Sequence, residues 1–317
     1  MTNKQKYREF CKSEDSIPLF SKSWWLDVTC DESNWDIALV EKDNKIVASL
    51  PYLKSKKNGA TILSQPKLTQ CLGVFIKYPK NQKYEKKISY EKEMMINLID
   101  QLPKYDLFSQ NMHYDMTNWL PFYWKGFSQT TSYTYVIEDL TDLDLIWLNF
   151  NNKTRTDIRK AEKIVKVVDS VDIEKFYEIN KMSFERQNIE ISYSLDYVKK
   201  IDIACKDRDK RKILFAIDDE NQIHAAIYII WDSESAYYIM GGGNPSLRNS
   251  GATHLLIWEA IKFSSSIVKK FDFEGSMMEQ VEKFVRSFGA VQKPYFHISK
   301  VNSKFFKIKQ LFKEVLK

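Results

Sequence analysis

Two stretches of the chain have the alternation of apolar and polar positions that is typical of a β-hairpin. Residues 35–53 read WDIALVEKDNKIVASLPYL, and residues 211–230 read RKILFAIDDENQIHAAIYII. In each stretch, two apolar runs flank a short polar turn, at Asp43 and Asn44 in the first and at residues 219–221 in the second. Apolar runs on both sides of a turn rich in Asp and Asn predict two antiparallel strands.

The elements predicted after each hairpin also repeat in the same order. A helix comes first, because residues 94–102 and 254–263 have apolar residues at helical spacing. Each half then has a short strand, a short aromatic helix that ends at a glycine, and a last strand. In the first half these are residues 105–108, the helix ending at Gly126, and residues 133–137. In the second half they are residues 271–274, the helix ending at Gly289, and residues 294–298. Four matching elements in one order predict two similar domains.

The repeat predicts an α/β protein, a tandem pair of domains that each contain a mixed (α+β) sheet. The boundary is expected in the acidic stretch 138–144, which gives an N-terminal domain of residues 1–140 and a C-terminal domain of residues 141–299. A length of 317 residues agrees with two domains of ordinary size. Residues 300–317 are left as a separate tail.

Compartment and metal content follow from what the sequence lacks. Its four cysteines and four histidines show neither a C-x-x-C nor an H-x-x-x-H pair, so no metal site is expected and the thiols are expected to be reduced. The N-terminus has no apolar leader, and the longest apolar run, 225–231, is too short to cross a bilayer. These patterns predict a cytoplasmic protein, at most peripheral to a membrane.

The formal net charge of +6 is concentrated in the tail. Residues 300–317 hold six lysines and one glutamate, so the remainder of the chain is close to neutral and general nucleic-acid binding is not indicated. Phe305, Ile308, Phe312 and Val315 fall on one helical face, which predicts a basic amphipathic helix. Two interpretations stay open: the helix lies on an anionic membrane, or it packs on a domain with its lysines in water.

The order of elements resembles the fold of the GCN5-related N-acetyltransferase (GNAT) superfamily, and two copies in tandem resemble the FemAB-like, methicillin-resistance-protein-like acyltransferases. Residues 152–163, NKTRTDIRKAEK, are similar to the R-x-x-I-x-K-A motif that opens the second domain in that family. Residues 18–28 resemble its N-terminal opening. Further similar segments follow at the family's usual intervals: residues 248–261, 271–277 and 284–296.

The resemblance implies transfer of an acyl or aminoacyl group to an amine of a cell-envelope glycan or peptidoglycan precursor. The donor would be an acyl-CoA or an aminoacyl-tRNA, bound by the second domain, and the acceptor a small or lipid-linked molecule in a cleft between the domains. The long helical-hairpin arm of some tRNA-using relatives is not evident in this sequence. An alternative is a non-catalytic module of the same fold that binds an anionic sugar nucleotide or RNA.

Residues 241–256, GGGNPSLRNSGATHLL, have the features of an anion-binding loop. A helix that begins near Gly251 would present free N–H groups, with Ser250 as its cap and Arg248 as a fork for phosphate. The GNAT loop that holds the coenzyme A pyrophosphate reads R/Q-x-x-G-x-G/A, and Thr253 departs from its last position. By this resemblance the donor-binding residues are Arg248, Asn249, Ser250, Gly251 and Ala252. An ordinary glycine-rich connection with a helix cap is the alternative.

The segment FDFEGS supplies the candidate catalytic carboxylates. In a strand, Asp272 and Glu274 would face the same side, next to Gly275. Amine acylation needs a proton acceptor, so Glu274 is the preferred general base and Asp272 its orienting partner. Tyr238, near the end of the preceding strand, is a candidate to hydrogen-bond a tetrahedral intermediate. A structural role for both carboxylates is the alternative.

Two groups of residues are candidates for acceptor binding. Arg155, Arg159 and Lys163 are spaced four apart and would form one basic stripe for the phosphates of an acceptor or of tRNA, unless they are simply a solvated face. Arg186, Gln187 and Tyr193, from the polar-aromatic segment 183–194, would line an acceptor pocket or a plain loop.

Five other residues are expected to be structural. His224 stands alone within a predicted strand, and four tryptophans are expected in the core of the first domain: Trp24, Trp25, Trp119 and Trp124.

Overall fold

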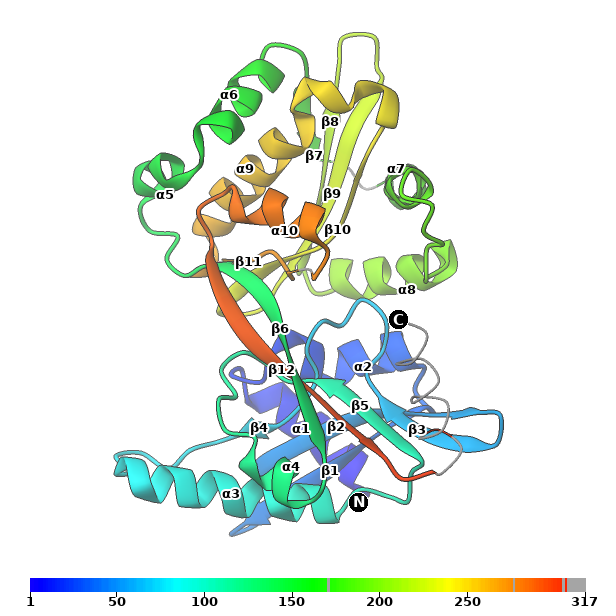
Figure 1. Cartoon of the computed structure of the whole chain (residues 1–317), viewed down its shortest axis with the longest axis vertical. Helices are drawn as coiled ribbons and strands as arrows, with labels where there is room; N and C mark the ends of the chain where they lie inside the picture. The colour runs from blue at the N-terminus through cyan, green and yellow to red at the C-terminus, as the bar shows by residue number, and fades with distance from the viewer. Residues whose placement is uncertain (170–171, 276, 304–305, 307–317) are drawn as a thin grey trace. The chain divides into compact units, whose positions relative to one another are not determined.

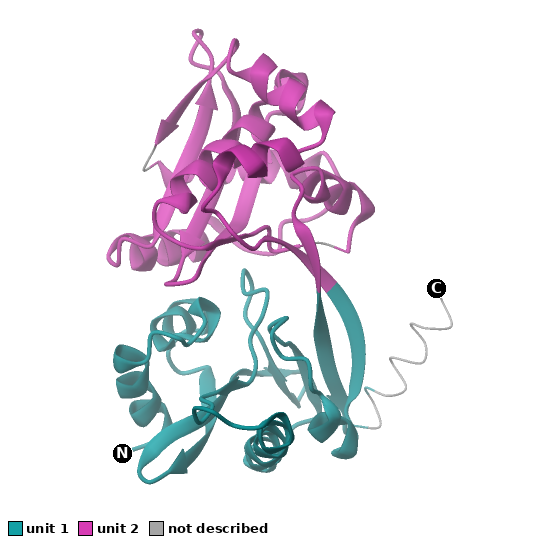
Figure 2. Ribbon diagram, turned by 90° about the vertical axis from the view of Figure 1, so that its left-hand side faces the viewer, with its two compact units in different colours: residues 1–132, 294–317 teal, residues 133–293 magenta. Residues whose placement is uncertain are grey.

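The structure is a computed structural model that describes residues 1–169, 172–275, 277–303 and 306. The chain divides into two compact units, which Figure 2 shows in different colours. Unit 1 consists of residues 1–132 and 294–317, and unit 2 of residues 133–293.

Unit 1 is a mixed sheet with helices packed on it (Figure 1). Its elements are α1 (Asn3–Ser13), the 3-10 helix η1 (Leu19–Ser21), α2 (Ser23–Cys30), β1 (Trp35–Lys42), β2 (Lys45–Lys57), β3 (Ala60–Ser64), β4 (Phe75–Ile76), α3 (Tyr84–Asp100), β5 (Leu107–Asn111), α4 (Leu120–Trp124) and the first half of β6 (Ser128–Ile137). The strand order is β1–β2–β3–β5–β12, where β12 (Val291–Val301) is the last strand of the chain. The neighbours β3 and β5 run parallel.

Alternation along β1 explains why helices cover both faces of this sheet. Ile37 and Leu39 are buried in a cluster with Tyr7 of α1, whereas Ala38 belongs to a second cluster with Met94 of α3. Successive side chains of a strand point to opposite faces, so an apolar run needs cover on both sides. The sequence therefore specifies a two-sided core.

The turn of the first hairpin has the predicted position. Asp43 and Asn44 adopt φ values of 51° and 59°, and Lys42 pairs with Lys45 across the turn. Two successive residues with positive φ are what a two-residue hairpin turn of the I′ type requires, and Asn and Asp tolerate this backbone better than most residues. The hairpin prediction is confirmed here.

Unit 2 repeats the plan with more helices. Its elements after β6 are α5 (Leu143–Asn149), α6 (Asn152–Ala161), β7 (Lys166–Asp169), α7 (Ile173–Glu185), α8 (Leu195–Lys206), β8 (Arg211–Ile217), β9 (Ile223–Trp231), β10 (Ser235–Gly243), the 3-10 helix η2 (Pro245–Ser250), α9 (Ala252–Ser265), β11 (Lys270–Asp272) and α10 (Glu279–Arg286). The strand order is β6–β11–β10–β9–β8–β7. Helices α7 and α9 lie on opposite faces of this sheet (Figure 1).

The last strand of each repeat pairs with the sheet formed by the other repeat. In unit 1, β12 pairs antiparallel with β5, with His297 opposite Asn111. In unit 2, β6 pairs antiparallel with β11, with Ile137 opposite Phe271. Both strands appear where the element order predicted them, and the α/β class with mixed pairing is confirmed.

This exchange divides the chain differently from the predicted ranges 1–140 and 141–299. Unit 2 begins at Tyr133, ahead of the acidic stretch, and residues 294–299 group with unit 1. The reason is that hydrogen bonding to β5 holds β12 in unit 1. Lys300 and Val301 are also part of β12, and the predicted tail helix otherwise falls at residues 304–305 and 307–317, which lie outside the described residues.

The expectation of four core tryptophans is wrong for one of them. Trp25 is fully buried, Trp24 and Trp119 are half-buried, and Trp124 is 54 % exposed. Helix α4 has only five residues, and it turns Pro121 and Phe122 inward, which leaves Trp124 on its outer side. Among the described helices, none is long and apolar enough to cross a membrane.

Candidate functional site

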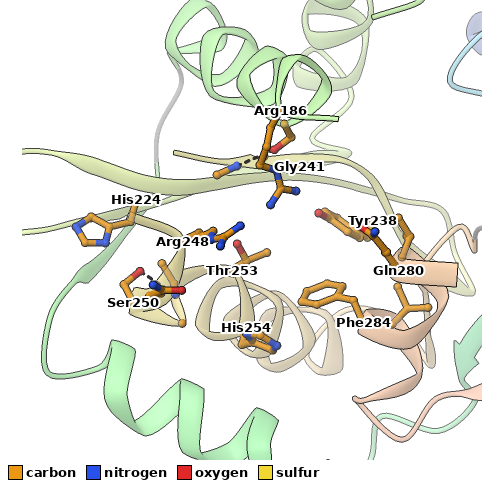
Figure 3. Close-up of a pocket in the computed structure, with 18 of the residues that line it drawn as sticks. Arg186, His224, Tyr238, Gly241, Arg248, Ser250, Thr253, His254, Gln280 and Phe284 are labelled. Atoms are coloured by element: carbon orange, nitrogen blue, oxygen red, sulfur yellow. Dashed lines mark hydrogen bonds between the residues drawn. The ribbon is translucent and has the colours of Figure 1, made fainter. Parts of the chain in front are cut away.

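Strand β11 pairs with only the first three residues of β10. The two strands pair in parallel from Ser235 opposite Lys270 to Tyr237 opposite Asp272, and β10 then continues to Gly243. A pocket of about 480 Å³ lies beyond this point (Figure 3). Its lining comes from β10, His224 of β9, the end of α7, the segment η2–α9, Phe273 and α10.

Glycines at the end of β10 give this pocket its shape. A Cβ atom on Gly241 would lie 2.0 Å from the hydroxyl oxygen of Tyr238, so the missing side chain is what makes room for that ring. A Cβ atom on Gly242 would lie 2.3 Å from the backbone oxygen of Ile179, so α7 approaches the strand closely at this residue. The register of β9 and β10 shifts between Tyr238 and Met240, and such bulges re-aim side chains.

The predicted donor loop forms one end of the pocket. Residues 248–250 end η2, Gly251 has a φ of 82°, and α9 begins at Ala252. The Ser250 hydroxyl accepts a hydrogen bond of 3.3 Å from the N–H of Ala252. A Cβ atom on Gly251 would lie 2.3 Å from the backbone oxygen of Asp157, so glycine is required here for both its backbone angle and the close packing of α6. The loop thus presents a helix N-terminus to the pocket, as predicted, although the N-cap residue is Gly251 and not Ser250.

Positive charge in the pocket is not balanced by lining carboxylates. The guanidinium groups of Arg186, at the end of α7, and Arg248 both point into the cavity (Figure 3). None of the residues that line the pocket is Asp or Glu. Neither arginine forms an ion pair with any described residue. The pocket is therefore suited to an anionic ligand.

Tyr238 lies at the other end of the pocket, with its hydroxyl directed inward (Figure 3). Burial raises the pKa of Tyr238 to about 12. The hydroxyl is therefore protonated at neutral pH and able to donate a hydrogen bond. A protonated hydroxyl of this kind can donate to an oxyanion or to a leaving group, and the catalytic role of Tyr238 stays a prediction.

The predicted residue Tyr193 does not line the pocket but supports it from behind. It is buried, and its hydroxyl donates a 2.7 Å hydrogen bond to Oδ1 of Asn180. Asn180 in turn donates from Nδ2 to the backbone oxygen of Gly241 at 2.8 Å. Ser183, from the same helix, accepts a hydrogen bond from the N–H of Gly243. Helix α7 thus fixes the end of β10 by side-chain contacts.

Two histidines line the pocket, and neither was predicted to do so. His224 is buried, its Nε2 lies 3.0 Å from Oδ2 of Asp218, and its buried Nδ1 has no hydrogen-bond partner among the described residues. The ring of His254 stacks on that of Phe288 with 5.8 Å between the ring centroids, and burial lowers the pKa of His254. A lone histidine in a strand carries no signal of its own, and the pairing of the N–H of Asn244 with the backbone oxygen of His224 is a contact that only the fold shows.

The two predicted carboxylates lie outside the pocket lining. Asp272 is 2 % exposed and accepts hydrogen bonds from the hydroxyl of Thr134, at 2.5 Å, and from the N–H of Glu274, at 2.8 Å. Burial, and secondarily the charge of Asp272, raises the pKa of Glu274 well above its usual range. The Oε1 atom of Glu274 is buried and has no hydrogen-bond partner among the described residues.

The prediction that both carboxylates project from one strand is wrong in its geometry. Strand β11 ends at Asp272, and Glu274 adopts a φ of 60° in the turn that follows. The turn continues through Gly275, where a Cβ atom would lie 2.2 Å from the backbone oxygen of Tyr133. Close packing against β6 therefore sets the direction of Glu274. Its role as general base, with Asp272 as its partner, stays a prediction.

The predicted basic stripe is shorter than expected and lies away from the pocket. Helix α6 ends at Ala161, so Lys163 sits in the turn beyond it and does not continue the stripe. Arg155 donates to the backbone oxygen of Leu148 at 3.3 Å, and the Arg159 guanidinium lies 5.6 Å from the ring centroid of Trp147. Acceptor binding by these residues stays a prediction.

One pocket nevertheless collects most of the predicted site residues. They share the open edge between β10, α7 and the start of α9: Arg248, Asn249, Ser250, Gly251, Ala252, Arg186, Gln187 and Tyr238. The sequence spacing identified the loop, whereas the fold was needed to place Arg186 and Gln187 beside it. No group of three or more His, Cys, Asp or Glu residues arranged to hold a metal ion occurs in the described part of the chain.

Comparison with known proteins agrees with this geometry. Residues 149–276 match the family described as "Acetyltransferase (GNAT) domain", a range that contains β10, the donor loop and β11. No curated protein sequence matches the chain.

Solved structures with the same fold cover nearly the whole chain. FemX has 12 % sequence identity and a TM-score of 0.67, over 93 % of this chain and 96 % of its own. The C-terminal domain of a putative lysylphosphatidylglycerol synthetase from Agrobacterium fabrum has 11 % identity and a TM-score of 0.56, over 99 % and 96 %. A tandem GNAT protein from the clavulanic acid biosynthesis pathway has 9 % identity and a TM-score of 0.50, over 88 % and 94 %.

The family match covers residues 149–276, which hold most of the pocket lining, and the fold likeness extends over both units. The predicted family resemblance is confirmed. The match also favours an enzyme over a module that only binds. The chain is an acyltransferase with a GNAT domain at residues 149–276, and its overall fold is like that of FemX.

Proposed function

We propose that this protein is an N-acyltransferase whose donor is an acyl thioester of the coenzyme A type, held in the pocket of unit 2. The observation that carries the proposal is the pairing of Arg186 and Arg248 in a pocket whose lining has no carboxylate. Phosphate groups at the start of α9 would meet Arg248 and the free N–H groups of the helix. The match of residues 149–276 to a GNAT domain supports this donor class.

The proposed reaction uses the donor loop at one end of the pocket and Tyr238 at the other. With phosphate held at the donor loop, the acyl group would reach toward Tyr238. The amine nitrogen would attack the acyl carbon, a C–N bond would form, and the C–S bond would break. Tyr238 would donate its hydrogen bond to the oxyanion or its proton to the departing thiolate. Most of the rate enhancement would come from holding the amine against the acyl carbon.

The acceptor we propose is an amine of a cell-envelope glycan or peptidoglycan precursor. Support comes from the fold likeness to FemX and to a protein named as a lysylphosphatidylglycerol synthetase, whose name states that an amino acid is joined to a phospholipid. In this scheme Glu274 takes the proton from the amine, either directly or through a water molecule.

Binding measurements test the donor. Acetyl-CoA and coenzyme A should raise the unfolding temperature of the wild-type protein, and titration calorimetry should give the affinity. Arg248→Ala should weaken binding by roughly 10- to 100-fold, because a charge-assisted hydrogen bond to phosphate is lost. Arg208→Ala is the matched control, since it removes an exposed arginine of the same unit outside the pocket lining and should leave the affinity unchanged.

Two results would overturn the thioester proposal. One is a shift with aminoacyl-tRNA and none with coenzyme A, which would assign the pocket to the other donor class. The second is coenzyme A binding that Arg248→Ala leaves intact. Release of free coenzyme A from acetyl-CoA in the presence of amino sugars or peptidoglycan precursors then tests the acceptor, and binding without any turnover would contradict the enzyme proposal.

A further inference from the structure

An exposed aromatic surface with lysines beside it covers helices α3 and α4 of unit 1. Four large side chains stand out from it, with exposed fractions of 43 % for Leu120, 57 % for Tyr123, 54 % for Trp124 and 79 % for Tyr84. Isolated exposed apolar residues are ordinary, but a group of them marks an interaction site. We call these four residues, together with Lys80, Lys83 and Lys92, the α3–α4 face.

Helix α4 places its aromatic residues outward because its other side is anchored. Phe122 is fully buried in the core cluster that contains Met94 of α3, and α4 packs on α3. Lys92 of α3 reaches to 5.2 Å from the ring centroid of Trp124. Tyr84 lies two turns before Lys92, at a spacing of eight residues, so both occupy one side of α3. The contact between Lys92 and Trp124 thus joins the outer side of α3 to the exposed side of α4.

Cations on this surface outnumber the carboxylates available to them. The acidic groups of α3 already have basic partners: Glu85 with Lys86 at 3.8 Å, Glu91 with Lys87 at 4.0 Å, Glu93 with Lys42 at 3.0 Å and Asp100 with Lys125. Lys80, Lys83 and Lys92 form no ion pair with any described residue. The α3–α4 face thus combines uncompensated positive charge with exposed Trp, Tyr and Leu.

We propose that the α3–α4 face docks the protein on an anionic lipid membrane. Trp and Tyr are favoured at the boundary between headgroups and hydrocarbon because their rings are apolar and their tips are polar. Lysines beside them are attracted to acidic headgroups. A single-stranded nucleic acid would pair with the lysines and stack its bases on Tyr123 and Trp124, but it would leave Leu120 in water, whereas a membrane takes up all three side chains. This surface is separate from the donor pocket and does not depend on the proposed function.

Vesicle sedimentation with the full chain tests the proposal. Wild-type protein should sediment with vesicles of phosphatidylcholine mixed with phosphatidylglycerol, bind less to phosphatidylcholine alone, and dissociate as salt is added. The variant Tyr123→Ser/Trp124→Ser should lose roughly tenfold or more in partitioning. The variant Lys83→Glu/Lys92→Glu should lose at least tenfold on anionic vesicles, since each lysine near such a surface contributes about a fivefold effect.

A matched control comes from unit 2. Leu145 and Leu148 on α5 are 55 % and 65 % exposed, so Leu145→Ser/Leu148→Ser removes a similar apolar area elsewhere and should not change partitioning. Equal thermal unfolding of all variants would show that they fold. All carry the same C-terminal segment, so any contribution from that segment cancels.

Equal sedimentation of wild type and both α3–α4 variants would overturn the proposal, as would a wild type that does not sediment with anionic vesicles. If the two α3–α4 variants bind vesicles as the wild type does but no longer bind tRNA or soluble glycan fragments, the face would be assigned to those ligands instead.

Discussion

The side-chain amide of Asn180 donates a hydrogen bond to the backbone oxygen of Gly241 over 2.8 Å, which ties helix α7 to the strand that forms the pocket. Asn180 is 1 % exposed, and its oxygen accepts from the hydroxyl of Tyr193. Because both of its polar atoms are used, Asn180 connects the rigid end of β10 to the segment behind it.

Asn180→Ala should therefore destabilise unit 2 and loosen the pocket together. The substitution removes the Asn180 partner of a partly buried backbone oxygen and of a buried hydroxyl, and an unpaired buried group costs about 1–3 kcal/mol. Urea unfolding measures the stability, and titration with donor measures the affinity. Tyr193→Phe is the matched control, because it leaves only Oδ1 of Asn180 unpaired and should cost less than half as much. Equal stability of Asn180→Ala and wild type would contradict this role.

The three glycines that end β10 should respond differently to alanine. At Gly241 the new Cβ meets the Tyr238 hydroxyl, which can swing away, so Gly241→Ala should reduce turnover with little loss of stability. At Gly242 it meets the backbone of Ile179, so Gly242→Ala should destabilise the fold by several kcal/mol. Gly243→Ala, with its nearest contact at 3.3 Å, is the mild control. Kinetics and unfolding of the set separate the two effects, and a uniform response would contradict them.

Tyr238→Phe should lower kcat and leave donor binding almost unchanged. The hydroxyl is the only atom group removed, and it lies where negative charge would develop on the oxyanion or the thiolate. A loss of about 100-fold in kcat is expected for one such donor. Because burial raises the pKa of Tyr238 to about 12, its hydroxyl should stay protonated between pH 6 and about 10, and the wild-type rate should show no decrease from its deprotonation in that range. An unchanged kcat would remove Tyr238 from the mechanism.

The sequence predicted the fold better than it predicted pairing between distant segments. Residues 133–137 and 294–298 have the local pattern of strands, and both are strands. Each of these strands pairs with a strand of the other repeat, β6 with β11 and β12 with β5. That choice of partner depends on contacts between distant segments, and no local pattern encodes it. The order of elements was therefore available from the sequence, whereas the division into units at Tyr133 and Pro294 was not.

The same distinction applies to the site. The donor loop was recognisable because a helix start, a glycine at positive φ and an arginine lie within four residues. Glu274 was misplaced because period-two alternation was extended past Asp272, where tight packing of Gly275 on Tyr133 ends the strand. Trp124 was misplaced because aromatic residues are usually buried, and only the shortness of α4 shows that it has one inner side. Non-local packing caused each difference.

Glu274 should make the free energy of unfolding depend on pH, and a substitution at this residue can separate its contribution from that of other groups. Burial raises its pKa in the folded state well above the ordinary value, so above about pH 4.5 the folded state binds more protons at this residue than the unfolded state does. The free energy of unfolding therefore falls as pH rises from that point toward the folded-state pKa. Glu274→Gln keeps the shape and removes the titration.

The variant should accordingly gain stability relative to wild type as pH rises from 5 to 8, with little difference at pH 4. Urea unfolding at each pH measures this, and the control is Glu190→Gln, an exposed glutamate of the same unit that should run parallel to wild type. If Glu274 is also the general base, kcat of the wild type should rise over the same pH range and Glu274→Gln should abolish that rise. A stability difference that does not change with pH would show that Glu274 is ionised in the folded protein.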